Sequence, residues 1–418
     1  MSDPLLENMI ENSKVLDMRQ AVFSRAPLSY RVGNSTLHVQ TRFVMLVSAV
    51  GLIALLVLFL VMPASRFGSS NLTSDLLGHG EDHSHRHRPW YTGFYNSTYP
   101  LSTPVYSDRG YIKYRIAVVS DLDTDSKHPT EKNTWLSYLK KVSHVRVTST
   151  VNVESQEVSV EWDKDVVTLT SGMAYGGRGM ELSELVVFNG RLYAVDDRTG
   201  VIYEVDLQGS RVIPWVILTD GSGREKKGFK SEWATVKDET LIVGGLGKEW
   251  TTSTGELVNH NPQWVKTVTT RGNVEHFDWT KNYEKLREAV GIHFPGYMIH
   301  ESCVWAETIK SWVFLPRRAS TARYNEVDDE HKGTNLMLTA SEGFEEVKVK
   351  HIGERLPTHG FSSFKFIPGT KENLVVALKS EEVKGKVSTY IMAFSMDGKV
   401  LLPETKVGDY KFEGIEFV

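Results

Sequence analysis

Short runs in which hydrophobic and polar residues alternate recur along the chain from Tyr111 onward, and tight-turn signals separate them. Asn189-Gly190 and Asp397-Gly398 are dipeptides of the kind that form two-residue β-hairpin turns. One segment, Trp279–Val290, instead spaces its apolar residues at helical intervals and is followed by Gly291 as a stop signal. The pattern therefore predicts a strand-rich domain with one convincing helix.

Five of the predicted hairpins begin in the same way, with an oxygen-bearing side chain ahead of an apolar strand and a polar turn. These side chains belong to Glu184, Glu232, Glu301, Ser362 and Glu413, and successive ones are separated by 48, 69, 61 and 51 residues. Four-stranded blades of a β-propeller occupy spans of this size. Hairpins arranged radially would bring the five oxygen groups to one axis, and such a ring suits a hard cation, Ca²⁺ above all. The sequence predicts an all-β, five-bladed β-propeller with a central calcium site.

The strand that begins at Glu413 has too few residues after it for a hairpin partner. Tyr114–Asp121 resembles the second strand of the first unit, so we expect it to supply the partner and to close the ring without an exposed sheet edge. The Val145–Trp162 region could instead count as a separate blade, which would make a six-bladed ring.

Antiparallel pairing returns the second strand of each hairpin to the face where the first strand began. The return points are Asp121-Leu122-Asp123, Asp196-Asp197-Arg198, Lys248-Glu249-Trp250, Arg317-Arg318 and Lys379-Ser380-Glu381. One rim would therefore place carboxylates and basic side chains beside the predicted cation. Arginine binds phosphate oxygens in bidentate fashion, and a carboxylate can orient water, so this combination suits hydrolysis of a phosphoanhydride. The blander alternative is that Arg317-Arg318 is a surface pair and Trp250 a core residue.

Composition narrows the choice of partners. The formal charge is -4 and the sequence pI is about 6.4, which does not indicate a nucleic-acid binder. Cys303 is the single cysteine, so no intramolecular disulfide can form. The fold must then rely on its core and on any bound metal.

The longest apolar run, Phe43–Ser65, has no charged residue and suits a helix that crosses a hydrocarbon layer of about 30 Å. Five basic residues precede it and only Arg66 follows closely, which places the N-terminus in the cytoplasm. We predict a cytoplasmic tail over 1–42, a transmembrane signal anchor over 43–63, a lumenal stalk over 64–108 and the propeller over 109–418. A cleaved signal peptide is the alternative, although a leader of 42 residues is long for one.

Two glycosylation motifs beyond the apolar run, at Asn71 and Asn96, agree with a lumenal domain. The expected location is the ER or Golgi membrane, with a soluble form if the chain is cleaved near Ala64. The sequence leaves the oligomeric state open, a homodimer included.

Long motifs throughout the predicted propeller resemble the calcium-activated nucleotidases, which are soluble-type apyrases related to salivary apyrases of blood-feeding arthropods. The motifs include YRIAVVSDLDTDS, GRGMELSELVVFNGRLYAVDDRTG, GGLGKEWTT, FLPRRAS and THGFSSFKFIP, and the likeness runs from about Trp90 to Val418. The resemblance implies a five-bladed propeller around Ca²⁺ that hydrolyses nucleoside diphosphates to monophosphate and phosphate. In membrane-anchored members it implies UDP and GDP as favoured substrates in the ER or Golgi lumen, where removal of UDP supports glycosylation and proteoglycan synthesis.

Carried over by motif, the resemblance implies a calcium shell of Ser183, Glu184, Glu232, Glu301, Ser362 and Glu413. Members of the family often have Asp where Glu184 stands. From their shared rim position we expect Asp121, Asp123 and Asp197 to orient water, with Arg317 as a catalytic cation. Arg198, Lys248, Trp250 and Arg318 are expected to bind substrate. The rival functions are a calcium-stabilised propeller that binds glycans or proteins, and a calcium-dependent lactonase.

Overall fold

The computed structural model describes residues 94–418, apart from 109 and 149–156, and two short strands nearer the N-terminus. The chain divides into two compact units, Met1–Pro89 and Trp90–Val418. In the first unit, β1 (Leu28–Val32) pairs antiparallel with β2 (Ser35–Val39). The predicted membrane span 43–63 and the Asn71 motif lie outside the described residues. Among the residues that are described, no helix is both long enough and apolar enough to cross a membrane.

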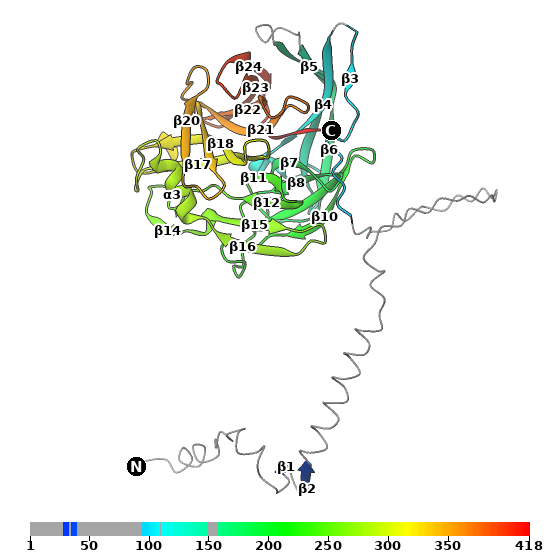
Figure 1. Cartoon of the computed structure of the whole chain (residues 1–418), viewed down its shortest axis with the longest axis vertical. Coiled ribbons are helices and arrows are strands. Elements are labelled where there is room, and N and C mark those ends of the chain that lie inside the picture. The colour runs from blue at the N-terminus through cyan, green and yellow to red at the C-terminus, as the bar shows by residue number, and fades with distance from the viewer. Residues whose placement is uncertain (1–27, 33–34, 40–93, 109, 149–156) are drawn as a thin grey trace, which may run out of the picture. The chain divides into compact units, whose positions relative to one another are not determined.

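The second unit is an all-β ring of five antiparallel sheets, as Figure 1 shows. Four of the sheets have four strands, and the fifth has five. Blade I contains β7 (Leu182–Phe188), β8 (Arg191–Asp196), β9 (Val201–Asp206) and β10 (Arg211–Ile217). Blade II contains β11 (Trp233–Lys237), β12 (Thr240–Gly244), β15 (Trp264–Val268) and β16 (Val274–Asp278). Blade III contains β17 (Tyr297–Ala306), β18 (Ser311–Ser320), β19 (Leu336–Ser341) and β20 (Val347–His351). Blade IV contains β21 (His359–Phe366), β22 (Leu374–Val383), β23 (Lys386–Ser395) and β24 (Val400–Gly408).

Blade V closes the ring by joining distant parts of the sequence. Its strands are β25 (Phe412–Phe417), β4 (Tyr111–Ser120), β5 (Trp135–Thr148) and β6 (Glu157–Ser171), with β3 (Val105–Tyr106) added beside β4. β25 pairs antiparallel with β4, in a register that runs from Phe412 opposite Ser120 to Phe417 opposite Ile116. The predicted closure is confirmed. The six-bladed alternative is wrong, because the Val145–Trp162 region belongs to β5 and β6 of this blade.

Local sequence explains the hairpins. Asn189 and Gly190 have φ values of 48° and 70°, and they join β7 to β8 with Phe188 opposite Arg191. Two successive residues with positive φ make the turn whose twist matches that of paired strands, and Asn-Gly adopts it at low cost. The predicted helix is also present: α3 (Thr280–Glu288) follows Trp279 and ends before Gly291, whose φ is 74°.

The core consists of five apolar clusters, and each cluster draws its residues from two neighbouring blades. Between blades II and III, for example, Trp233 of β11 meets Phe314 of β18 edge to face, with ring centroids 6.1 Å apart. Side chains alternate along a strand, so each sheet can bury residues on both faces against its neighbours. Burial of these faces fixes the positions of the inner strands, which supply the functional residues.

Short elements are inserted between the strands of the blades. They are η3 (Asp123–Ser126), β13 (Trp250–Thr251), β14 (Leu257–Asn259), η5 (Asn261–Gln263) and α4 (Glu326–Asp329). Residues ahead of β4 also join the unit, although the sequence predicts a stalk there: the Tyr99 hydroxyl donates to Glu416 over 3.0 Å, and Asn96 is exposed.

Candidate active site

The innermost strands carry β-bulges at the oxygen-bearing residues that the sequence singles out. The register of strand pairing shifts at Ser183 in β7, at Ser362 in β21, at Glu413 in β25 and across Glu301 in β17. A bulge leaves one residue out of the ladder and redirects its side chain. Glu232 lies immediately before β11, and its backbone N–H donates to Gly244 O over 2.8 Å. We call the five residues Ser183, Glu232, Glu301, Ser362 and Glu413 the hub.

Contacts within the hub join different blades. Ser183 Oγ lies 3.1 Å from Glu232 Oε2 and 3.4 Å from Glu413 Oε2. The Arg317 guanidinium bridges the carboxylates of Glu301 and Glu413, at 2.9 Å from Glu413 Oε1. Ser362 Oγ is buried, and it has no hydrogen-bond partner among the described residues.

Glu184, which the sequence places in the calcium shell, has its carboxylate held by other groups. Ser363 Oγ lies 2.8 Å from one carboxylate oxygen, which also accepts from the Leu185 N–H over 2.8 Å. Lys365 Nζ lies 3.2 Å from the other oxygen. Burial raises the pKa of Glu184 to about 7, although Lys365 and Ser363 act to lower it. In blade I the bulge therefore directs the Ser183 side chain to the hub, while the neighbouring Glu184 forms a buried ion pair with Lys365.

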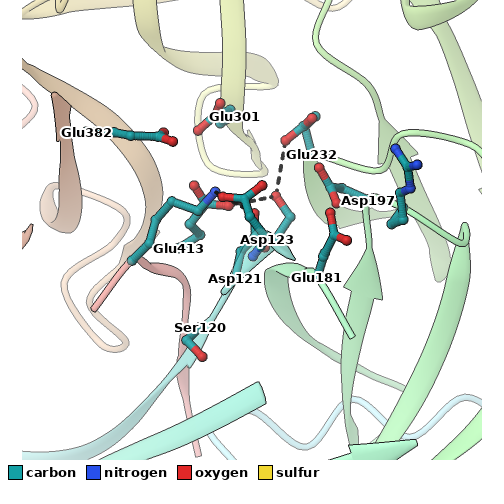
Figure 2. A network of polar contacts seen from close by, with 12 residues as sticks. Ser120, Asp121, Asp123, Glu181, Asp197, Glu232, Glu301, Glu382 and Glu413 are labelled. Carbon is teal, nitrogen blue, oxygen red and sulfur yellow. Dashed lines mark hydrogen bonds and ion pairs between the residues drawn. The ribbon is translucent and has the colours of Figure 1, made fainter. Parts of the chain in front are cut away.

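A cavity of about 440 Å³ opens beside the hub and collects most of the predicted catalytic and binding residues. Its walls include Asp121, Asp123, Asp197, Lys248, Trp250, Arg317 and Arg318, together with Glu232, Glu301 and Glu413. In Figure 2 several of these carboxylates face a common space. Arg198 is not part of the wall; it is half-buried, with Nε 3.5 Å from Tyr175 O. Ser183, Glu184 and Ser362 also lie outside the cavity lining.

Lysine ammonium groups pair with the predicted water-orienting carboxylates. Lys411 Nζ lies 2.6 Å from Asp121 Oδ2 and also bonds to Asp123. Burial raises the pKa of Asp121 to about 6, and Lys411 limits the rise. Lys230 bridges Asp197 and Glu232, at 2.9 Å from Glu232 Oε1. A pKa of about 6 suits a carboxylate that accepts a proton from water, because the group is ionised at neutral pH but more basic than an ordinary aspartate.

Another acidic group lies at the edge of the cavity. Oxygens of Asp121, Asp123 and Glu181 lie within 4.8 Å of one another. Arg178 neutralises part of this charge, because its guanidinium bonds to Glu181 over 2.7 Å and lies 3.1 Å from Asp123 Oδ1. Figure 2 shows the Glu181 carboxylate next to that of Asp197.

The basic wall of the cavity is held by hydrogen bonds and ion pairs. Arg318 lies 2.7 Å from Asp329 Oδ2. Lys248 Nζ donates to Glu249 O over 2.8 Å and lies 4.2 Å from the centre of the Tyr324 ring. Burial lowers the pKa of Lys248 to about 8. Trp250 leaves 37% of its surface exposed at the cavity wall, and Lys227 Nζ lies 4.3 Å from the centre of its ring.

The residues fit an oxygen-binding divalent cation at the hub. Three hub carboxylates from different blades converge there, and the buried Ser362 hydroxyl lacks a hydrogen-bond partner within the described part of the chain. Burial raises the pKa of Glu232 to about 8, with Asp197 and Glu301 adding to the rise and Lys230 opposing it. Negative charge in excess of the available cations is typical of a site that holds a metal, and oxygen ligands suit Ca²⁺.

Comparison with known proteins identifies the family. The Apyrase family model matches residues 122–418. A rat protein named soluble calcium-activated nucleotidase 1 is 59% identical over 324 residues, which cover 78% of each chain. The chain belongs to the apyrase family. An apyrase of Cimex lectularius is 40% identical over 394 residues, covering 93% of this chain and 99% of that one, and apyrase apy-1 of Caenorhabditis elegans is 45% identical over 314 residues.

Membership of the apyrase family makes the chain a hydrolase that acts on nucleotide phosphates, in particular on nucleoside diphosphates. The cavity beside the hub brings carboxylates and basic groups of the apyrase domain to one wall-lined space.

Sequence reasoning missed several residues of the apyrase cavity. Lys230 and Lys411 each precede a hub glutamate by two positions, in KSEW and KFEG. Residues two apart in extended chain lie on the same side, so this spacing was a readable signal that Glu232 and Glu413 each have a lysine nearby. Tyr324 and Asp329 come from the insertion after β18, and no hairpin pattern marks them.

Proposed function

We propose that the protein is a calcium-dependent hydrolase of nucleoside diphosphates, with UDP and GDP as preferred substrates and monophosphate and phosphate as products. The observation that carries the proposal is the charge of the cavity. Nine carboxylates and five basic side chains line it. A diphosphate anion would be repelled from such a wall unless a cation accompanied it. Relatives at 58 to 59% identity are named calcium-activated, which supports calcium as that cation.

Calcium would be held by the hub carboxylates and hydroxyls, and when bound it would supply positive charge for the phosphate oxygens. The positive charge of Arg317 offsets the negative charges of Glu301 and Glu413. It therefore reduces the repulsion between these carboxylates and the substrate phosphates. Lys248 and Arg318 are the basic groups that bind phosphate oxygens from the opposite wall. The exposed part of the Trp250 side chain, at the cavity wall, contacts the base.

Asp121 takes the proton from the attacking water. Its carboxylate keeps a fixed orientation because Oδ1 accepts the Asp123 N–H over 2.8 Å and Oδ2 pairs with Lys411. Asp197 lies at the same wall, anchored by Lys230. A carboxylate whose pKa is near 6 is ionised at neutral pH and still basic enough to accept the proton as the phosphoanhydride bond breaks.

The location of the enzyme is also a proposal. The uncharged run over 43–63, with basic residues on its N-terminal side, supports a single-pass anchor that leaves the propeller in the ER or Golgi lumen. There the enzyme would remove UDP released by glycosyltransferases and so support glycosylation and proteoglycan synthesis. Glycosylation motifs at Asn71 and Asn96 agree with a lumenal domain.

Phosphate release from UDP, measured with calcium and with excess EGTA, tests the proposed function. We expect release with calcium and its loss in EGTA, with recovery when calcium is restored. GDP, ADP and a lactone are measured in parallel, because a lactonase would act on the lactone and a binding module would release nothing. Equal rates in calcium and EGTA would refute the calcium requirement.

A further inference from the structure

A second hollow, of about 530 Å³, lies on blade III and shares no lining residue with the catalytic cavity. It lies between the end of α3, the end of β18 and the outer strands of the blade. We call it the blade III hollow and define it by Lys332, Asn335, Leu336, Val349, His351 and Arg355.

The charge of the blade III hollow is opposite to that of the catalytic cavity. Lys332, His351 and Arg355 line it, and none of its lining residues is acidic. In the part of the chain that the structure describes, no ion pair joins Lys332 or Arg355 to a carboxylate. Lys332 and Arg355 therefore leave positive charge available for an anion, although the net charge of the chain is -4.

Hydrogen bonds hold Arg355 and, through Asn335, His351 in place. Arg355 Nε donates to Gly333 O over 2.9 Å, which fixes the guanidinium and leaves its two terminal nitrogens for a ligand. Asn335 Nδ2 donates to Gly353 O over 2.9 Å, so Asn335 Oδ1 faces His351 Nδ1 at 3.0 Å. His351 must therefore donate from Nδ1, and in its neutral form Nε2 is an acceptor.

The nearby end of α3 does not cancel this positive charge. Helix C-termini are negative where their carbonyls lack partners. Here Lys285 O accepts from Ala289 N over 3.1 Å, and Arg287 O accepts from Ile292 N over 3.0 Å. These carbonyls of the last turn of α3 therefore already have hydrogen-bond partners. The apolar side chains of Val290 and Ile292 line the hollow beside it.

We propose that the blade III hollow binds a phosphate group, either as hydrogen phosphate or as the phosphate monoester of a small organic molecule. The Arg355 fork suits two oxygens of a tetrahedral anion, and Lys332 adds a point charge. Hydrogen phosphate can donate its own proton to His351 Nε2, which sulfate cannot do. Leu336 and Val349 provide an apolar surface for the carbon body of an ester.

Thermal unfolding of the full chain in calcium buffer, titrated with orthophosphate, glycerol phosphate or sulfate at constant ionic strength, tests the proposal. We expect a saturable rise in Tm with the two phosphates and a smaller one with sulfate. K332Q/R355Q should weaken phosphate binding by about tenfold or more, because it removes the charge-assisted bonds. The matched control R271Q/K386Q removes two exposed basic side chains elsewhere and should bind like the parent.

A third variant separates this site from the catalytic cavity. If K248Q abolishes the Tm rise while K332Q/R355Q keeps it, the anion binds in the catalytic cavity and the proposal is overturned. Tighter binding of glycerol phosphate than of orthophosphate would identify an esterified ligand, and equal binding would identify free phosphate. K332Q/R355Q should hydrolyse UDP like the parent. The rise in Tm reports anion binding and does not depend on catalysis. The test therefore remains valid even if the protein proves not to hydrolyse UDP.

Discussion

The ion pair between Glu184 and Lys365 offers a sharp test of how the hub is built. The two groups lie 3.2 Å apart, and their side chains are 0% and 6% exposed. Glu184→Gln keeps the shape of the side chain but leaves the Lys365 ammonium buried without its partner. We expect this substitution to destabilise the folded domain strongly and to alter calcium affinity less than Glu232→Gln does.

The magnitude follows from burial. Removing one partner of a buried ion pair costs roughly 3–5 kcal/mol, because the other charge remains in a poorly solvating interior. An exposed pair of similar geometry contributes about 0–1 kcal/mol. Lys237 and Glu342 form such a pair, with 2.9 Å between Nζ and Oε1 and the glutamate side chain 62% exposed. Glu342→Gln is therefore the matched control and should cost little.

Urea unfolding in saturating calcium gives the free energy of unfolding of each variant. The double variant E184Q/K365M removes both charges of the pair, so it should recover most of the loss, and the double-mutant cycle should show a coupling of about 3 kcal/mol. Additive costs of E184Q and K365M, or an E184Q cost as small as that of E342Q, would refute the buried pair. A large loss of calcium affinity with unchanged apo stability would instead make Glu184 a metal ligand.

Three further predictions concern the catalytic cavity and the hub. Lys411→Met removes the charge that limits the rise of the Asp121 pKa above 3.8. The acidic limb of the pH–rate profile for UDP hydrolysis should therefore move upward from about 6 by a unit or more. An unmoved limb would exclude Asp121 as the base. Gly414→Ala places a Cβ about 2.5 Å from the Leu185 backbone nitrogen. This clash should lower the free energy of unfolding by about 1–3 kcal/mol, measured by thermal or urea unfolding. Unfolding like that of the parent would contradict the close approach of blades V and I. Ser362→Ala deletes a hydroxyl that has no hydrogen-bond partner among the residues the structure describes, so unfolding in EGTA should be unchanged while calcium affinity, measured by titration, falls. Unchanged affinity would remove Ser362 from the metal site.

The sequence contains enough information for the ring and for most of the cavity. Period-two patterning and Asn-Gly turns mark the strands, and the spacing of the oxygen-bearing residues gives the number of blades. The pairing of Glu413's strand with Tyr114–Asp121 could be predicted because an unpaired inner strand would be a sheet edge.

What the sequence left ambiguous is the direction of individual side chains. Ser183 and Glu184 are adjacent, and one residue of register decides which of them reaches the hub. A bulge makes that decision, and bulges have no simple sequence signal. For a similar reason Arg198, at a predicted return point, lies off the cavity wall while Lys230, which was overlooked, lies within it.

Ring closure through β25 also sets the order in which the protein becomes functional during synthesis. Every other strand of the propeller leaves the ribosome before Glu413 does, so the hub lacks one of its carboxylates until translation of the domain is nearly complete. A nascent chain with four blades cannot assemble the full coordination shell, and nucleotide hydrolysis would begin only when the last strand has docked beside β4.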